Sequence, residues 1–181
     1  MAIFKLSVWN AWLLSVPFVA LGFLFMGMKK DIAKRMSDMT GYNKKEKFFT
    51  VAASLAPYPF MIGTIWTPFT AKPLFLCIGL LFYIIGMALF AGTLRTIIQT
   101  PHDEPFRSGP YRYTRNPLYV AATTVFIGIC FATANIILSG YLIIAILLQH
   151  FMILAEERVC REKYGIAFEE YLKEVPRYLI T

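Results

Sequence analysis

Charged residues are scarce in this 181-residue chain. They make up 16% of the sequence, whereas hydrophobic residues make up 57%, and the mean hydropathy is +0.57. So few polar side chains leave too little polar surface for a soluble domain of this length. The composition therefore excludes an ordinary soluble protein and indicates a chain that lies in a bilayer.

Residues that commonly build metal, disulfide or nucleotide sites are also few. The three cysteines show no paired spacing, and the two histidines, His102 and His150, lack the neighbours that a zinc site needs. No glycine-rich fingerprint follows a predicted strand. We therefore expect no metal site, no disulfide and no Rossmann nucleotide site, so any cofactor must be held by helix ends and loops.

Long hydrophobic runs make up most of the remaining sequence. A bilayer core of about 30 Å needs about 20 apolar residues per helix. The sequence predicts an all-α integral membrane protein with five transmembrane helices, the last two forming a tight helical hairpin, and with a cytoplasmic C-terminal cofactor-binding region. We expect a single membrane-embedded domain over residues 1–181, with spans near 6–28, 48–69, 74–94, 118–133 and 135–155.

Positive charge is distributed unevenly between the connecting loops. The second loop has only Lys72, whereas the first contains Lys29, Lys30, Lys34, Arg35, Lys44, Lys45 and Lys47. Because cationic loops face the cytoplasm, we expect the N-terminus outside, and the 95–117 loop and the C-terminal tail in the cytoplasm. Lys and Arg that face anionic lipid explain the net charge of +7, so no nucleic-acid partner is expected.

The loop before the fourth run carries the sequence SGPYRYTRNPLY over residues 108–119. Asn116 followed by Pro117 predicts a helix N-cap with proline at the first helical position. Free amides at this helix start, together with Arg112 and Arg115, would attract a carboxylate or another anion. The alternative is that the Tyr and Arg residues of this segment only anchor the chain at the membrane interface.

Polar residues also mark the end of the fifth run. Glu156 and Glu157 follow it directly, and a helical spacing of seven residues places Gln149 near Glu156 and His150 near Glu157. Polar groups at this depth are candidates for function because each needs a partner or water. The alternative is that the two glutamates are the first solvated residues after a span, and that Gln149 and His150 hydrogen-bond neighbouring helices.

Taken together, SGPYRYTRNPLY and the later segment AEERVCREKYGIAFEEYLKEVPRYL resemble the isoprenylcysteine carboxyl methyltransferase family and its relatives among the phospholipid methyltransferases. The similarity covers about residues 95–179. It implies S-adenosyl-L-methionine as the cofactor, held by about 95–119 and 150–179. It also implies a lipid-anchored or lipophilic methyl acceptor in contact with membrane lipids, and it leaves the oligomeric state open.

The resemblance also implies the residues of the site. Glu156 would hold the cofactor's amino group or offset its sulfonium, and Arg112 or Arg115 would face its carboxylate. Glu157 or His150 would take a proton from an amine acceptor. The residues expected around the cofactor are Gln99, Asp103, Glu104, Pro105, Phe106, Tyr111, Asn116, Pro117, Leu118, Tyr119 and Glu156.

Three positions depart from the family pattern. Asn116 stands where histidine is usual, Ala121 replaces a frequent glycine, and Met152 stands where the isoprenylcysteine enzymes have an arginine for the substrate carboxylate. The function expected from the resemblance is methylation of the C-terminal carboxylate of an isoprenylated cysteine. Methylation of a phospholipid amine or of another small lipophilic acceptor, and a non-catalytic membrane scaffold, are the alternatives.

Overall fold

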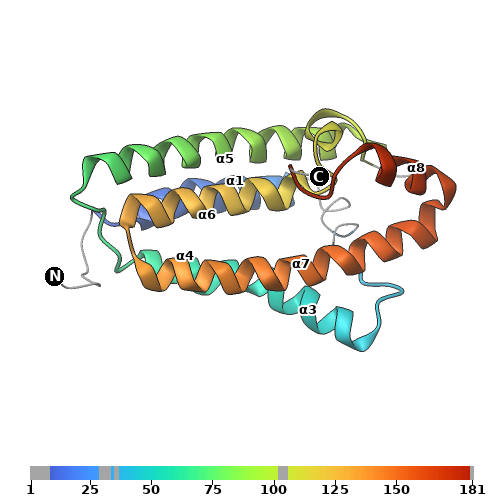
Figure 1. The fold of residues 1–181 in the computed structure, drawn as a ribbon, viewed down its shortest axis with the longest axis horizontal. Helices are drawn as coiled ribbons and strands as arrows, with labels where there is room; N and C mark the ends of the chain where they lie inside the picture. Colours follow the sequence, from blue (N-terminus) through green and yellow to red (C-terminus); the bar gives the residue numbers. More distant parts are fainter. Residues whose placement is uncertain (1–8, 29–33, 35–36, 102–105, 180–181) are drawn as a thin grey trace.

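The computed structural model describes residues 9–28, 34, 37–101 and 106–179, and the regular structure within them is helical (Figure 1). The helices are α1 (Trp12–Met28), α3 (Lys44–Leu55), α4 (Pro57–Thr64), α5 (Pro73–Gln99), the 3-10 turn η1 (Gly109–Arg112), α6 (Pro117–Thr133), α7 (Ile136–Tyr164) and α8 (Ile166–Glu174). The predicted all-α fold is confirmed.

Two of these helices, α5 and α7, are long and apolar enough to cross a membrane. Two further helices, α1 and α6, are apolar but have only 17 residues each. These features indicate a membrane protein. The count of five spans and the orientation of the chain stay predictions.

The run expected as the second span, 48–69, is divided into two helices. Ala56, which joins α3 to α4, keeps helical backbone angles (φ −56°, ψ −34°), so the chain continues without turning back. Pro57 and Pro59 lack the N–H group that the helical ladder needs, and each proline ring crowds the preceding turn. The single helix expected for this run is therefore replaced by α3 and the short α4.

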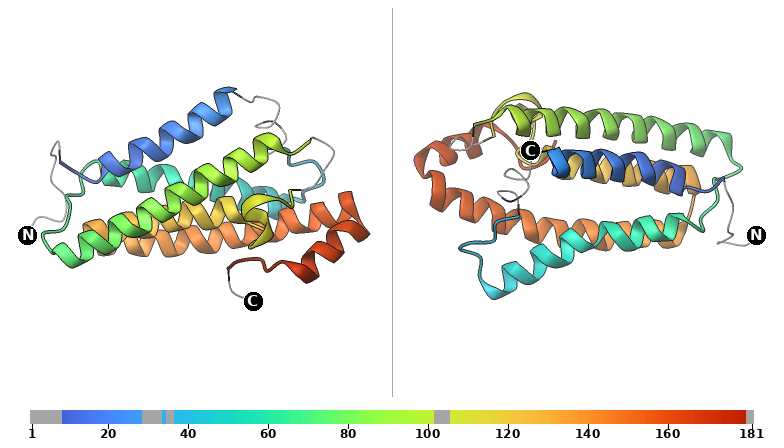
Figure 2. Two further views of the ribbon diagram at one scale, coloured as in Figure 1. Left: turned by 90° about the horizontal axis from the view of Figure 1, so that it is seen from above. Right: turned by 180° about the vertical axis from the view of Figure 1, so that it is seen from behind.

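Close backbone contact joins α5 to α6, which run antiparallel (Figures 1 and 2). A Cβ atom at Gly79 of α5 would lie 2.4 Å from the backbone nitrogen of Ala132, and one at Gly128 of α6 would lie 2.6 Å from that of Tyr83. Glycines at both positions let the two backbones approach to a distance that no side chain permits. This contact fixes where the start of α6 lies relative to α5.

The turn between α6 and α7 consists of Ala134 and Asn135. Ala134 adopts a left-handed conformation (φ 49°, ψ 33°) that ends α6. The side-chain oxygen of Asn135 caps α7 by accepting hydrogen bonds from the backbone nitrogens of Ile137 and Leu138, at 2.9 and 3.2 Å. Although this connection is short, α6 packs mainly against α5, and α7 packs mainly against α3. The tight turn between the two helices is present, and the packing of the predicted hairpin as a unit stays a prediction.

Segments far apart in the sequence meet at one end of the bundle, on the right in Figure 1. The ends of α5 and α7 lie here together with η1, the start of α6, and α8. Phe168 and Tyr171 of α8 pack near Tyr164 of α7, so the chain folds back toward the bundle after α7. The two segments expected to form the cofactor region, 95–119 and 150–179, therefore lie beside each other.

We predict that Gly79→Ala destabilises the protein, because the new methyl group meets backbone atoms of α6 that cannot rotate away. Overpacking of this kind costs about 1–3 kcal/mol. Thermal unfolding in detergent measures the effect. Gly140→Ala in α7 is the matched control, since a Cβ atom there has no neighbour within 4 Å. Equal melting temperatures for the two variants would contradict the close contact.

Candidate functional site

The loop before α6 is bound to α8 and to the C-terminal segment through backbone carbonyl groups. Arg107 of the loop donates a hydrogen bond to the carbonyl oxygen of Ala167. Five further hydrogen bonds join the two segments: Tyr171 Oη to Tyr111 O (2.7 Å), Thr114 Oγ1 to Arg177 O (2.9 Å), Arg115 N to Pro176 O (3.0 Å), Arg115 Nη1 to Leu172 O (3.0 Å) and Asn116 Nδ2 to Arg177 O (3.1 Å). The two halves of the expected cofactor region therefore form one structural unit.

Glu157 is buried between two arginines. Its carboxylate accepts hydrogen bonds from Arg177, with Nη2 2.8 Å from Oε2, and lies 3.2 Å from Nε of Arg115. Burial lowers the pKa of Arg115, and the charge of Glu157 opposes this shift. The hydrogen bond to Glu157 raises the pKa of Arg177. We call these three residues the ion cluster; it joins α7, the loop before α6 and the C-terminal segment.

The ion cluster bears on two of the residues expected to be catalytic. Arg115 was expected to face the cofactor's carboxylate, and Glu157 to accept a proton. The structure pairs these two side chains with each other, and Arg115 also donates a hydrogen bond to the carbonyl oxygen of Leu172 at 3.0 Å. Both therefore hold the chain together in this structure. Arg112, the other expected arginine, is exposed on η1.

Tyr119 and Glu156 form a second pair, between α6 and α7. The Tyr119 hydroxyl donates a hydrogen bond of 2.5 Å to Oε1 of Glu156. The same hydroxyl lies 4.0 Å from the sulfur of Met152, and Ser54 Oγ lies 3.9 Å from that sulfur on its α3 side. Glu156 has no ion-pair partner among the residues that the structure describes. The Tyr119 hydroxyl is thus the hydrogen-bond partner that the structure gives this carboxylate.

Asn116 has a role that differs from the expected one. Helix α6 begins at Pro117 as predicted, but the side chain of Asn116 does not cap it. Instead, the amide group donates to the carbonyl oxygen of Arg177, as described above. The backbone of Asn116 (φ −127°, ψ 50°) turns this amide toward the C-terminal segment rather than along the helix axis.

The other residues expected around the cofactor fall into three groups. Phe106 stacks on buried Tyr111, with ring centroids 5.2 Å apart, and Leu118 packs against the same cluster. Pro117 is buried, and Gln99 is exposed at the end of α5. The third group lies outside the described residues: Asp103, Glu104 and Pro105.

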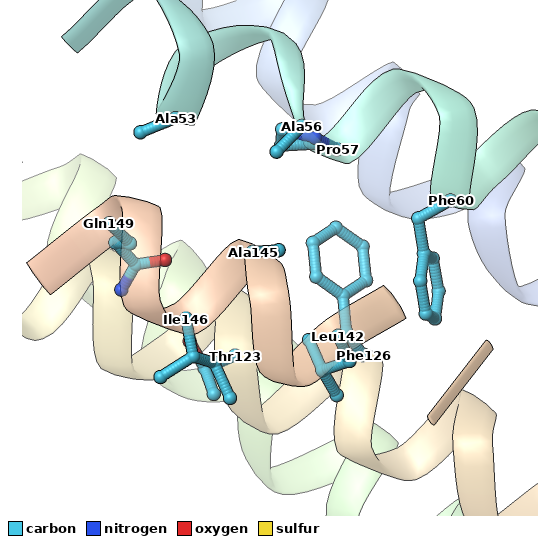
Figure 3. Close-up of a pocket in the computed structure, with 10 residues that line it drawn as sticks. All are labelled: Ala53, Ala56, Pro57, Phe60, Thr123, Phe126, Leu142, Ala145, Ile146 and Gln149. Atoms are coloured by element: carbon cyan, nitrogen blue, oxygen red, sulfur yellow. The ribbon is translucent and has the colours of Figure 1, made fainter. Parts of the chain in front are cut away.

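An apolar pocket opens between α3, α4, α6 and α7 (Figure 3). Its volume is about 20 Å³, roughly the space of one water molecule, and it is partly open to the outside. Apart from Thr123 and Gln149, its lining is nonpolar: Ala53, Ala56, Pro57, Phe60, Phe126, Leu142, Ala145 and Ile146. Gln149 and Met152 precede Glu156 on α7 at spacings of seven and four, so the pocket and the Tyr119–Glu156 pair lie along one face of α7.

Sequence reasoning missed Arg177 and Tyr171 as residues of this region. Both belong to the segment AEERVCREKYGIAFEEYLKEVPRYL. Arg177 binds the buried carboxylate of Glu157, and Tyr171 donates a hydrogen bond to a backbone carbonyl oxygen. From residue 156 onward acids outnumber cations by six to five, so the charge pattern gives no signal for either residue. Only the fold shows that Arg177 is needed inside.

We predict that Glu157→Gln destabilises the protein by about 1–3 kcal/mol, between the values for exposed and fully buried ion pairs. The substitution leaves two arginines close together without their shared anion. Unfolding in detergent gives the free energy, and amide hydrogen exchange at 175–178 shows whether the C-terminal segment loosens. Glu169→Gln is the control, because its ion pair with Arg161 is about half exposed on both sides. Unchanged exchange in Glu157→Gln would refute the anchoring role.

Comparison with known proteins places the chain in a family. A model of the family described as phospholipid methyltransferase matches residues 74–167, which is more than half of the chain and includes α5, α6, α7 and the Tyr119–Glu156 pair. This family includes isoprenylcysteine methyltransferases. No curated protein and no solved structure matches the chain. The match to the family model shows that the chain belongs to the phospholipid methyltransferase family.

Proposed function

We propose that this protein is an S-adenosylmethionine-dependent methyltransferase that acts on a lipid-borne acceptor at the Tyr119–Glu156 pair. The observation that carries the proposal is the partly buried carboxylate of Glu156, which Tyr119 orients and which no described cation neutralises. Removing such a charge from water is costly unless it is paired. A cofactor that carries both an ammonium and a sulfonium supplies the positive charge that would pair with this carboxylate.

An aromatic cluster beside the start of α6 suits this cofactor. The stacked rings of Phe106 and Tyr111, with Leu118 packed beside them, offer a nonpolar surface for a flat purine. When bound, S-adenosylmethionine supplies a methyl group activated on a sulfonium, and alignment of the acceptor provides much of the rate. With the orientation that the loop charges predict, this end of the bundle faces the cytoplasm.

The apolar lining of the pocket supports a lipophilic acceptor. Because the pocket holds only about 20 Å³, a hydrocarbon chain would have to part α4 from α6 and α7 to lie against Phe60, Phe126 and Ile146. Its polar head group would then lie toward Gln149 and Met152, on the face of α7 that carries Glu156.

Two kinds of methyl acceptor are candidates, a carboxylate and an amine, and the described residues favour the amine. Sequence resemblance favours the carboxylate of an isoprenylated cysteine, which needs a cation beside it. Met152 offers none, and the nearby Arg115 and Arg177 already bind Glu157. A carboxylate acceptor would also be repelled by Glu156. A phospholipid amine is therefore the first candidate, and an isoprenylcysteine carboxylate is the second.

An amine acceptor must lose a proton before its nitrogen can attack. Of the two groups expected to take that proton, Glu157 is bound by arginines, and Nδ1 of His150 lies 2.7 Å from the Tyr178 hydroxyl. Glu156 is the remaining carboxylate on this face of α7. We assign the proton to Glu156, with the Tyr119 hydroxyl holding the carboxylate in place.

We predict that the protein in detergent binds S-adenosylhomocysteine and that Glu156→Ala weakens this binding about 10- to 100-fold, since a hydrogen bond to a charged group contributes about 1.5–3 kcal/mol. Calorimetric titration measures the dissociation constant. Tyr119→Phe should weaken binding less, because the charge remains. Glu170→Gln on exposed α8 is the control. Absence of binding in the unaltered protein would point to the non-catalytic scaffold.

We predict that a labelled methyl group passes from S-adenosylmethionine to phosphatidylethanolamine in mixed micelles, and to a farnesylated cysteine analogue at a lower rate. Met152→Arg should reverse this preference, because it places a cation where an acceptor carboxylate needs one. The product ratio by thin-layer chromatography reports the preference. Faster methylation of the cysteine analogue by the unaltered protein would make the isoprenylcysteine carboxylate the first candidate acceptor.

A further inference from the structure

Two polar side chains line the otherwise nonpolar pocket between α3, α4, α6 and α7 (Figure 3). They are Thr123 of α6 and Gln149 of α7. In the part of the chain that the structure describes, neither side chain has a hydrogen-bond partner. The neighbouring Thr124 differs, because its hydroxyl donates to the carbonyl oxygen of Val120 in its own helix at 2.7 Å. The pocket therefore contains polar groups whose hydrogen bonds the described protein does not supply.

Polar groups in these surroundings indicate a ligand rather than a contribution to stability. An amide or a hydroxyl without a hydrogen bond costs free energy in nonpolar surroundings, and a nonpolar side chain of similar size would avoid that cost. The pocket has a volume of about 20 Å³, which is room for one water-sized group. A carbonyl oxygen is of this size, so it can enter without parting the helices.

Both residues lie on the helix faces that carry the Tyr119–Glu156 pair. On α6, Thr123 follows Tyr119 by four residues. On α7, Gln149 precedes Glu156 by seven residues, and both spacings place side chains on one face of a helix. With a rise of 1.5 Å per residue, these spacings correspond to about 6 Å on α6 and about 10 Å on α7. The polar part of the pocket therefore lies about 6–10 Å along the helices from the proposed site of methyl transfer.

This separation matches one of the two candidate acceptors. In an extended phosphatidylethanolamine, the amine nitrogen and the nearer ester carbonyl carbon are separated by about nine bonds, or about 10 Å. One lipid can therefore place its nitrogen at Glu156 and a carbonyl oxygen in the pocket. In an isoprenylated cysteine, the thioether sulfur is close to the carboxylate, and the lipid chain beyond it is hydrocarbon, which accepts no hydrogen bond. Such an acceptor would leave Gln149 unpaired.

We propose that Thr123 and Gln149 bind an ester carbonyl group of the lipid acceptor, and that they select a glycerophospholipid with ester-linked chains. The Gln149 amide Nε2 and the Thr123 hydroxyl donate, and the carbonyl oxygen accepts through its two lone pairs. This inference rests on the proposed function and adds a point of recognition away from the reacting atoms. A site that hydrogen-bonds a substrate group discriminates against an analogue without it, because the polar groups of the site are then left unpaired.

The test uses two lipids that differ only in their carbonyl oxygens: diester phosphatidylethanolamine and its diether analogue, with the same head group and chain length. Native mass spectrometry of the protein in detergent with an equal mixture measures which lipid is retained, without any cofactor. We expect the diester to be retained in about 5- to 30-fold excess, as one or two hydrogen bonds provide. Gln149→Leu and Thr123→Val should each lower this excess, and the double variant should retain the two lipids equally.

The matched control is Thr124→Val, because the hydroxyl that it removes is bound within α6. It should leave the excess of diester unchanged. Gln149→Leu should keep or raise the melting temperature, since it removes an unpaired polar group from a nonpolar lining. A lower melting temperature would indicate a structural role for Gln149 and would overturn the proposal.

The two proposals fail in different ways. Equal retention of the two lipids by the unaltered protein would overturn the ester subsite, even if the protein methylates both. An excess of diester that persists in the double variant would also overturn it, because the preference would then arise elsewhere. Selective retention that the double variant loses, without methyl transfer from S-adenosylmethionine, would reject the proposed function and support the ester subsite.

Discussion

The buried carboxylate of Glu157 is the constraint on which the rest of this end of the molecule depends. Three segments that are remote in the sequence meet at this carboxylate. Helix α7 carries the glutamate itself. The loop before α6 contacts it through Arg115, and the C-terminal segment contacts it through Arg177. A carboxylate removed from water must be paired, so these segments cannot separate without leaving a charge uncompensated. The adjacent residue, Glu156, thereby receives a fixed position beside Tyr119.

The helix contact between α5 and α6 supplies the second fixed reference. Glycines on both helices bring the backbones together, so that the start of α6 has a defined height and rotation relative to α5. Tyr119 lies in the first turn of α6, and its hydroxyl donates a hydrogen bond to Glu156 of α7. Packing within the apolar bundle thus helps to position the Tyr119 side of this polar pair.

Local signals in the sequence predicted part of this arrangement. Continuous apolar runs predicted an all-α fold, and Asn116 followed by Pro117 predicted where α6 begins, because both signals depend on neighbouring residues alone. The prolines within the second run indicate that its helix is divided. The prediction of a single span depended instead on the length of the apolar run. The pairing of Glu157 with Arg177 and the hydrogen bond from Asn116 to the C-terminal segment depend on tertiary contact, and no spacing rule reports them.

The two arginine contacts beside Glu156 differ in how they meet the solvent. Arg115 and Glu157 are both nearly buried, whereas the guanidinium of Arg158, which binds Glu46 at the start of α3, is about one-third exposed. Mobile ions screen exposed charges and leave buried ones nearly unaffected. The contact of Arg115 with Glu157 is therefore almost indifferent to ionic strength, whereas the contact of Arg158 with Glu46 weakens as salt rises. A change in the ionic composition of the surrounding solution would loosen the joint between α3 and α7 and leave the centre of the ion cluster in place.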